Sequence, residues 1–279
     1  MSAFPDLPLE DNPEDIVGKA QRGLGLTEPQ LAERAGLSTD VVVALLEGQL
    51  DESALRAVAP VLALDADSLV RQANGDFEPE PVELEGLLMA NTEFDDMTVN
   101  AFIVFDPATR VGALFDTGAK VDPLVEQARA LDLNIEQVFL THTHADHIAD
   151  LGNALQDFAV GQAMVGEGEG FAGAVPFAPG AKFAIGNLQV ETRLTWGHAK
   201  GGITFVISGL KRPLAIVGDA IFAGSMGGGK ESYADALETN RQAIFTLPDD
   251  TVVACGHGPL TSVGEEKANN PFFPEFKQA

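Results

Sequence analysis

Residues 141–147 read Thr-His-Thr-His-Ala-Asp-His and follow the apolar and β-branched run IEQVFL at 135–140. That run predicts a short strand, with the histidines on the loop at its end. In an extended chain the side chains alternate faces, so His142 and His144 should point the same way and share one metal ion. Asp146 and His147 are adjacent, and we expect them to reach a second ion about 3.5–4 Å from the first.

The other two of the five histidines stand in two further short motifs. His198 lies in WGHAKGG and His257 in CGHGP, and Asp219 follows an apolar run in IVGDAIF. Imidazole and carboxylate groups together suit zinc, iron or manganese, whereas calcium and magnesium prefer oxygen ligands alone. The histidine and aspartate pattern therefore predicts a transition-metal site.

The run His142-Thr-His144-Ala-Asp146-His147 resembles the HxHxDH motif of the metallo-β-lactamase superfamily, and the resemblance covers roughly residues 80–279. Further matches follow in order: ALFDTG ending at Gly118, Gly197-His198, Gly218-Asp219, and Gly256-His257-Gly258-Pro259. The resemblance implies an α/β (α+β) fold, a four-layer αββα sandwich with the metals at one sheet edge. GDAIFAGSMGG and LPDDTVVACGHGP look most like the compact, glyoxalase II-like branch.

By this resemblance two divalent ions are expected, zinc first, with iron or manganese as alternatives. His142, His144 and His198 would hold one ion, Asp146, His147 and His257 the other, and Asp219 would bridge them. A metal-bound hydroxide would attack a thioester or related ester of a small molecule, as in hydroxyacylglutathione hydrolases, and Asp146 or Asp219 would move the proton. Asp116 and Thr141 stand beside the ligand segments and are candidates to orient imidazole N–H groups.

Three departures from these relatives leave the substrate open. Gly258 and Pro259 stand where glutathione-binding enzymes carry a tyrosine, Gly228 lies where a basic residue is usual, and Phe222 replaces the tyrosine of the lactonase branch. Persulfide dioxygenases share much of the motif set but use one iron, which here would be held by His142, His198 and Asp219. A mononuclear iron oxygenase is therefore the alternative enzyme.

Residues 1–75 are expected to form a small all-α domain, joined by a linker at 76–81 to a catalytic domain at 82–279. LTEPQLAERAGLSTDVVVALLEGQ, from Leu26, predicts one helix ending at Ala35, a turn at Gly36 and a second helix capped by Ser38. This pattern resembles the helix-turn-helix domain of Cro and repressor-type proteins over roughly residues 15–75. If the boundary separates independent units, the catalytic domain should fold without residues 1–75.

Charge argues against nucleic acid as the partner of this domain. Residues 1–75 hold five basic and thirteen acidic side chains, and the second predicted helix has no Lys, Arg, Asn or Gln to read bases. We therefore expect self-association or docking on the catalytic domain, with a ligand-sensing regulator as the alternative.

Composition limits the cellular setting. The net charge of −25 disfavours anionic membranes, no run of 18 apolar residues occurs, and the acidic start is unlike a signal peptide. Cys255 is the one cysteine and has no internal partner for a disulfide. The expected location is the cytoplasm.

Overall fold

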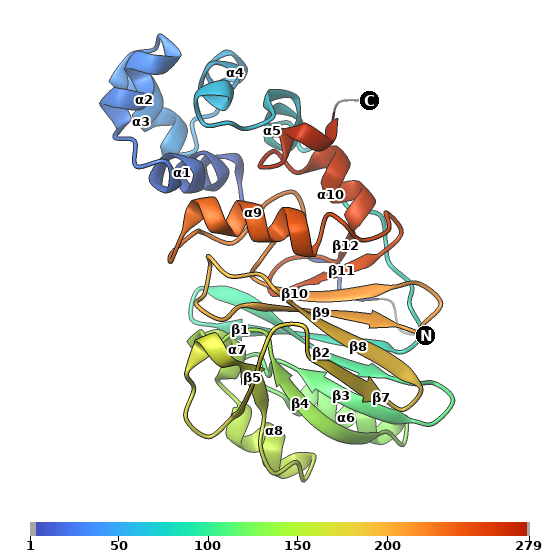
Figure 1. Ribbon diagram of the computed structural model, residues 1–279. Helices are drawn as coiled ribbons and strands as arrows, with labels where there is room; N and C mark the ends of the chain where they lie inside the picture. The colour runs from blue at the N-terminus through green and yellow to red at the C-terminus, as the bar shows by residue number, and fades with distance from the viewer. Residues whose placement is uncertain (1–3, 278–279) are drawn as a thin grey trace.

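Two six-stranded sheets lie face to face in the computed structural model, which describes residues 4–277 (Figure 1). The first sheet has the order β1-β2-β3-β4-β5-β6 and the second β12-β11-β10-β9-β8-β7. The strands of the first sheet are β1 (Leu87–Phe94), β2 (Met97–Phe105), β3 (Val111–Phe115), β4 (Asn134–Leu140), β5 (Met164–Gly166) and β6 (Val175–Phe177). Those of the second are β7 (Lys182–Ile185), β8 (Leu188–Leu194), β9 (Ile203–Ser208), β10 (Leu214–Gly218), β11 (Val252–Cys255) and β12 (Thr261–Ser262).

One pair of parallel strands in each sheet brings the metal-site motifs together. β3 pairs with β4 in parallel, with Phe115 opposite Phe139, and β10 pairs with β11 in parallel, with Ile216 opposite Ala254. Parallel neighbours need a crossover, supplied here by α6 (Asp122–Ala130) and α9 (Tyr233–Ala243). Each of these four strands runs directly into one of the motifs, so the motifs gather at the carboxyl ends of the strands.

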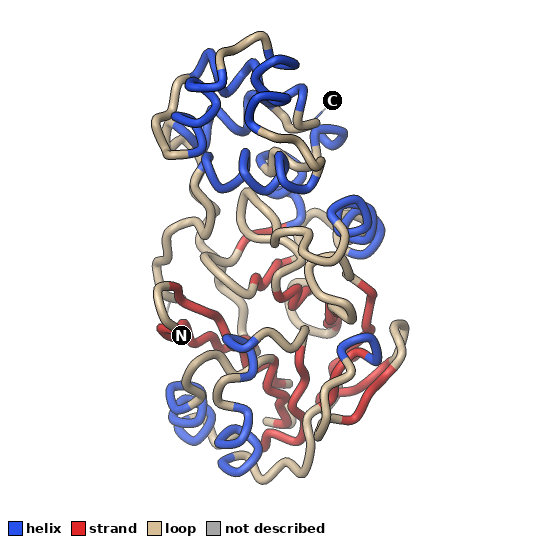
Figure 2. Tube along the Cα trace, turned by 90° about the vertical axis from the view of Figure 1, so that its left-hand side faces the viewer, coloured by secondary structure: helices blue, strands red, loops and turns tan. Residues whose placement is uncertain are grey.

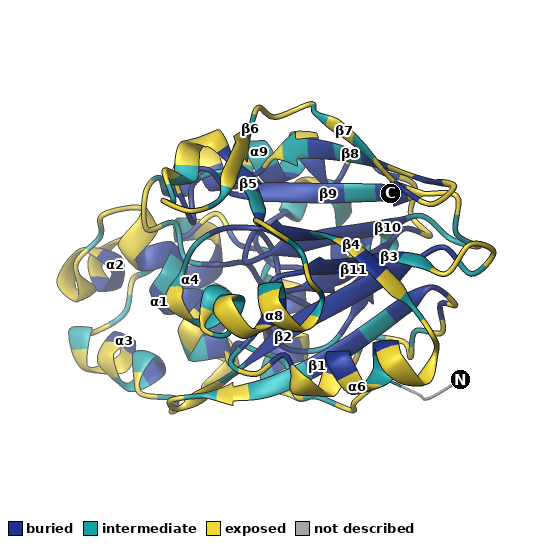
Figure 3. Ribbon diagram, turned by 90° about the horizontal axis from the view of Figure 1, so that it is seen from below, coloured by how far each residue is buried: buried dark blue, intermediate teal, exposed yellow. Residues whose placement is uncertain are grey.

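Aromatic side chains fill the space between the sheets. Phe115 stacks on Phe139 with ring centroids 5.2 Å apart, and Phe205 from the facing sheet meets the edge of Phe115 at 5.1 Å. Such offset and edge-to-face pairs add to the burial of large apolar area. Figure 3 shows the strands as the buried centre of the molecule, with exposed residues on the outer helices.

Helices cover the outer face of each sheet. Leu124 and Val125 of α6 pack with Leu114 and Val138 on the first sheet, in a cluster that also includes residues of α8 (Leu151–Asp157). On the second sheet Val253 shares a cluster with residues of α9 and of α10 (Val263–Asn269). The predicted four-layer αββα sandwich is confirmed. Smaller elements are α7 (Ala145–Ile148) and the 3₁₀ turns η1 (Glu167–Glu169) and η2 (Pro274–Lys277).

The N-terminal region is all helical, as predicted. It consists of α1 (Pro13–Gly23), α2 (Glu28–Ala35), α3 (Thr39–Leu46), α4 (Glu52–Val61) and α5 (Ala66–Ala73). Ser38 caps α3 by accepting a hydrogen bond from the N–H of Val41, and Gly36 takes the left-handed φ of 69° that ends α2. Helix α1 was not predicted from the sequence. The predicted linker at residues 76–81 contains neither helix nor strand.

The helical region lies at one end of the molecule (Figure 2) and shares a hydrophobic core with α9 and α10, and Figure 1 shows α1 beside α9 and α5 beside α10. One continuous cluster joins Ile16, Leu31 and Leu69 of the helical region to Phe222 and Phe273. Across the same contact the N–H of Asp65 donates to the carbonyl of Pro271, and Gln72 Nε2 donates to the carbonyl of Gly224. Removal of residues 1–75 would therefore expose apolar surface of the sandwich.

No helix within residues 4–277 has the length and apolar character that crossing a bilayer would require.

The shared core predicts that the helical region and the sandwich unfold together. Ile16→Ala leaves a cavity at a fully buried site and should cost about 2–5 kcal/mol, whereas Val43→Ala, at a residue 38% exposed, should cost no more than about 0.5 kcal/mol. Far-ultraviolet circular dichroism follows the helices, and the single tryptophan, Trp196, reports on the sandwich. Both signals should shift together in Ile16→Ala; loss of helical signal ahead of the Trp196 signal would contradict a common core.

Candidate metal centre

The first cluster gathers three imidazoles from two distant segments. His142 Nε2 lies 2.9 Å from His144 Nδ1, and His198 Nε2 lies 3.0 Å from the same nitrogen. His142 and His144 follow β4, and His198 stands on the loop before β9. These three nitrogens and an oxygen of Asp219 lie within 4.8 Å of one another, an arrangement that can surround one ion.

The second cluster consists of Asp146, His147 and His257. Asp146 Oδ2 lies 3.4 Å from His147 Nε2 and 3.2 Å from His257 Nε2. Asp146 and His147 belong to the short helix α7, and His257 follows β11. Two short helices, α7 and α8, follow one another here, and α7 begins at Ala145, so both ligands are on helical backbone.

Asp219 lies between the two clusters. Its Oδ1 is 3.1 Å from His147 Nε2, and its Oδ2 is 3.3 Å from His198 Nε2 and 3.4 Å from His257 Nε2. The structure therefore brings together all seven residues singled out from the sequence, and of their two carboxylates Asp219 is the one that faces imidazoles of both groups.

Asp116 orients two of the imidazoles. Its Oδ2 lies 2.9 Å from His147 Nδ1 and accepts the Thr141 hydroxyl at 2.7 Å, while its Oδ1 accepts the Thr141 N–H at 2.7 Å. Because the Thr141 hydroxyl donates to Asp116, it accepts from His142 Nδ1, which is 3.0 Å away. The expected roles of Asp116 and Thr141 are thus matched by contacts, and both imidazoles keep Nε2 for the cluster.

Backbone carbonyls orient two more imidazoles. His198 Nδ1 lies 2.9 Å from the carbonyl of Gly228, and His257 Nδ1 lies 2.6 Å from the carbonyl of Thr98. A carbonyl can only accept, so each Nδ1 must carry the hydrogen, which turns Nε2 toward the clusters. Neither carbonyl could be predicted as a partner from the sequence. Every residue has a backbone carbonyl, and the side chains of Gly228 and Thr98 give no sign of which histidine it contacts.

Glycine is required where the backbone approaches Asp219 most closely. A Cβ on Gly256 would lie 2.2 Å from Asp219 Oδ1, and one on Gly227 would lie 1.9 Å from the Asp219 carbonyl oxygen. Both distances are far below van der Waals contact, so any larger residue would displace the bridging position. This explains why glycine precedes His257.

Charge at the two clusters is strongly coupled. Burial by itself would lower the pKa of His147, but the carboxylates of Asp219 and Asp116 outweigh it and raise that pKa to about 10. Burial also opposes a charged His257, yet Asp219 and Asp146 raise its pKa to about 11. At His142 burial dominates, assisted by His147, and holds the pKa well below the usual range. Metal ions would replace the protons that the carboxylates otherwise draw onto the imidazoles.

Five buried side-chain polar atoms lack hydrogen-bond partners within the described part of the chain, and two of them lie at the metal-ligand clusters. His147 Nε2 and Asp219 Oδ1 are inaccessible to solvent and form no aligned hydrogen bond, and when the His147 ring is neutral each carries a lone pair. An unsatisfied buried acceptor costs about 1–3 kcal/mol, so such atoms need an explanation. A divalent cation between the carboxylate and the imidazoles would supply it, and the nitrogen and oxygen donors suit zinc, iron or manganese.

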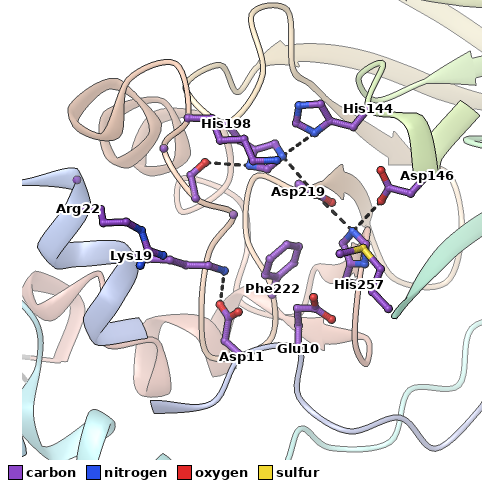
Figure 4. A pocket seen from close by; sticks show the side chains of 16 residues that line it. Glu10, Asp11, Lys19, Arg22, His144, Asp146, His198, Asp219, Phe222 and His257 are labelled. Atoms are coloured by element: carbon purple, nitrogen blue, oxygen red, sulfur yellow. Dashed lines mark hydrogen bonds and ion pairs between the residues drawn. The ribbon is translucent and has the colours of Figure 1, made fainter. Parts of the chain in front are cut away.

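A cavity of about 540 Å³ opens onto both clusters (Figure 4). His144, Asp146, His198, Asp219 and His257 reach its surface, while His142 and His147 lie behind them. Residues from the N-terminal segment and α1 also line it. The lining of the cavity by residues 10–23 could not be predicted from the sequence, because nothing local in this segment indicates which distant loop it contacts.

The loop after Asp219 forms one wall of the cavity and is anchored by a buried carboxylate. Glu266, which is fully buried, accepts hydrogen bonds from the Gly224 N–H at 3.1 Å, the Thr261 hydroxyl at 2.9 Å and Asn270 Nδ2 at 2.8 Å. Burial raises the pKa of Glu266 to about 7, against the opposing effect of these donors.

Comparison with known proteins identifies relatives. A family model described as the metallo-beta-lactamase superfamily matches residues 95–257, so the five N-terminal helices lie outside the match. Hydroxyacylglutathione hydrolase GloC of Haemophilus influenzae is 25% identical over 197 residues, 62% of this chain and 92% of the relative. Human mitochondrial persulfide dioxygenase ETHE1 is 29% identical over 168 residues, 54% of this chain and 64% of the relative. The crystal structure of ETHE1 from Myxococcus xanthus superposes with a TM-score of 0.59 at 26% identity, covering 67% of this chain and 85% of that one.

Replacement of Asp219 should separate the clusters. Asp219→Ala removes the one carboxylate that faces both groups and leaves five imidazoles without it, so metal affinity should fall by about 10- to 100-fold or more. Metal content per chain after dialysis, measured by inductively coupled plasma mass spectrometry, tests this. Two retained ions in the variant would show that Asp219 does not bridge.

Because burial raises the pKa of Glu266, we expect the free energy of unfolding to depend on pH. Between its ordinary pKa of 4.5 and about 7 the folded protein binds a proton that the unfolded chain has lost, so stability falls as pH rises through that window. The fall should be on the order of 3 kcal/mol in the native chain and absent in Glu266→Gln. Urea unfolding at pH 4.5–8 measures it, with Glu33→Gln, at an exposed residue, as the control. Parallel curves for the native chain and Glu266→Gln would rule the effect out.

Proposed function

The chain belongs to the metallo-beta-lactamase superfamily and is a metallohydrolase of that fold, and we propose that it cleaves a thioester or related ester with two divalent metal ions. The observation that carries this proposal is the position of Asp219 between two complete ligand clusters beside one open cavity. In the proposal His142, His144 and His198 hold one ion, and Asp146, His147 and His257 hold the other.

Bound there, zinc or a similar ion would provide hydroxide near neutral pH and would polarise a carbonyl oxygen. The remaining task for the protein is to orient its ligands and move a proton. Asp116 and the carbonyls of Gly228 and Thr98 perform the first task by holding the rings of His147, His198 and His257.

Of the two candidate proton carriers, we assign the role to Asp146. Both oxygens of Asp219 already face imidazoles, whereas Asp146 has such contacts at Oδ2 alone. The side chain of Asp146 is also more accessible from the cavity, 13% exposed compared with 8% for Asp219. One free oxygen at the cavity surface is what proton transfer to or from substrate requires.

The acidity of Asp146 favours a thiol leaving group. Burial opposes its ionised form, but His257 and His147 lower the pKa of Asp146 below its usual range, so near neutral pH it is a carboxylate that can accept a proton but has none to give to a leaving group. A thiolate leaves without protonation because thiols have a pKa of about 8.5, whereas an amine cannot leave as its anion. Relatives bearing the name hydroxyacylglutathione hydrolase support a thioester in the same direction.

A second candidate is a persulfide dioxygenase with one iron. His142, His198 and Asp219 belong to one cluster and form a two-histidine, one-carboxylate set, and relatives carry that enzyme's name. A single ion there would leave the second cluster, with the unpartnered His147 Nε2, without a role. This is why we prefer the dinuclear hydrolase.

We further propose that the helical region acts within this molecule and does not bind nucleic acid. Its shared core with the sandwich and its excess of acidic side chains support this. Self-association through α3, where Val41 and Val43 are more than a third exposed, stays a prediction. DNA binding at moderate salt would favour the regulator alternative.

Metal content and a substrate panel test the enzyme proposal. Protein purified without added metal should contain close to two ions per chain, hydrolyse a simple thioester and consume no oxygen with glutathione persulfide. Asp146→Asn should lower kcat for the thioester by about 10²–10⁴-fold, because the amide cannot accept the proton that the attacking water loses. One iron per chain with oxygen uptake would overturn the hydrolase in favour of the dioxygenase.

A further inference from the structure

Helix α1 forms the wall of the cavity that faces the metal-ligand clusters. Lys19, Arg22 and Gly23 from α1 line the same cavity as His198 and Asp219, and Figure 4 shows both cationic side chains extending from the helix beside it. The match to the family model begins at residue 95, so the α1 residues that form this wall lie outside the part of the chain that the model matches.

Close packing holds α1 against the loop that carries His198. A Cβ on Gly23 would lie 2.2 Å from Cγ of Tyr233, so the end of α1 rests directly on the first turn of α9. The N–H groups of Glu231 and Ser232, just before α9, both donate to the carbonyl of Gly197. Arg22, the neighbour of Gly23, is therefore held next to the His198 segment.

Lys19 has a structural role within this wall. Its Nζ pairs with Asp11 and donates to the carbonyl of Met226 at 2.9 Å, and it lies 5.0 Å from the centre of the Phe222 ring. Asp11 also accepts the hydroxyl of Ser225. The charge of Lys19 is thus neutralised by Asp11 and used to fasten the loop after Asp219.

Arg22 and Lys230 carry charges that remain available. Within residues 4–277 neither side chain forms an ion pair or a hydrogen bond, although the chain has 42 acidic residues for 17 basic ones. Lys230 lies in the same loop as Gly228, the carbonyl partner of His198, and its ammonium is one of the charges that act on His144. Two unpaired cations therefore line the cavity: Lys230 on the loop that contacts His198, and Arg22 on α1, where its guanidinium lies beside Gly18.

Of the four acidic residues that line the cavity, only Glu10 has a side chain with no ion pair or hydrogen bond within residues 4–277, and it lies at the other side. A Cβ on Gly258, the neighbour of His257, would lie 3.1 Å from the backbone nitrogen of Glu10 and 3.4 Å from its Cβ. Glu10 thus lies near the second cluster, and the Arg22 and Lys230 charges face a part of the cavity without a free carboxylate. The cavity is polarised, with its cationic side against α1.

We propose that Arg22 and Lys230 bind a carboxylate on the substrate, so that the N-terminal helical region selects anionic thioesters. A guanidinium forms paired hydrogen bonds with a carboxylate, and a nearby ammonium adds a point charge. Arg22 and Lys230 are specificity-determining residues that contact the end of the substrate away from the metal ions. This role rests on the proposed function for the identity of the scissile bond, but the binding itself does not depend on turnover.

A matched pair of inert ligands tests the binding. In isothermal titration calorimetry on the zinc-loaded full chain, 3-(propylthio)propanoate should bind about tenfold more tightly than the corresponding primary amide. Arg22→Gln and Lys230→Gln should each remove most of this preference, and Arg22→Lys should retain part of it. Arg34→Gln is the matched control, because it removes the same charge from an exposed arginine of α2 outside the cavity.

Equal binding of acid and amide to the native chain would overturn the assignment. So would a preference that survives in both Arg22→Gln and Lys230→Gln, because the carboxylate would then be held by the metal ions. Thioesters of 3-mercaptopropanoate and of its amide provide the kinetic arm, in which Arg22→Gln should raise KM for the acid alone and leave kcat unchanged. Hydrolysis of both at equal kcat/KM with no binding preference would refute the cationic wall but not the hydrolase; binding preference without hydrolysis would refute the hydrolase alone.

Discussion

The carboxylate of Asp219 is the feature on which the rest of this structure depends. It is almost fully buried, and a buried charge is costly unless opposite charge and donors surround it. Four of the five histidines direct a ring nitrogen to within 4 Å of its oxygens. At the same place the chain has glycine at 227 and 256, where a Cβ would clash with Asp219. The two sheets therefore meet around a buried negative charge. Only bound protons or metal cations can stabilise it.

The position of this centre could be predicted from the sequence because it follows from strand direction. THTHADH comes after an apolar run that is indeed β4, and GDAIF and GHGP come after β10 and β11. Parallel strands end at the same edge of a sheet, so motifs at those ends had to converge. The details were not predictable in the same way. His144 offers Nδ1 and the other imidazoles Nε2, and the difference depends on the turn into α7 and on carbonyls such as that of Gly228.

The N-terminal helices show the opposite balance. Their local signals were strong, since Thr27, Ser38 and Gly36 each mark a helix end that the structure contains. The packing of these helices on the sandwich left no local signal, because it depends on contacts between residues far apart in the chain. Gln72 reaches Gly224, and Gly23 meets Tyr233, with some 150 to 210 residues between partners. The same local signals thus predicted the helices α2 and α3 without indicating which contacts the region makes with the sandwich.

The charge of the chain and the charge of the cavity are separate properties. A net charge of −25 would repel an anion at long range, but physiological salt screens exposed charges beyond about 8 Å. Within that distance an entering ligand meets Arg22, Lys230 and the metal centre, while Asp11 is neutralised by Lys19. The surface acids therefore act on solubility and on large polyanions such as nucleic acid, which cover much more of the surface. A small carboxylate experiences the local field of the cavity, so an acidic protein can still select an anionic substrate.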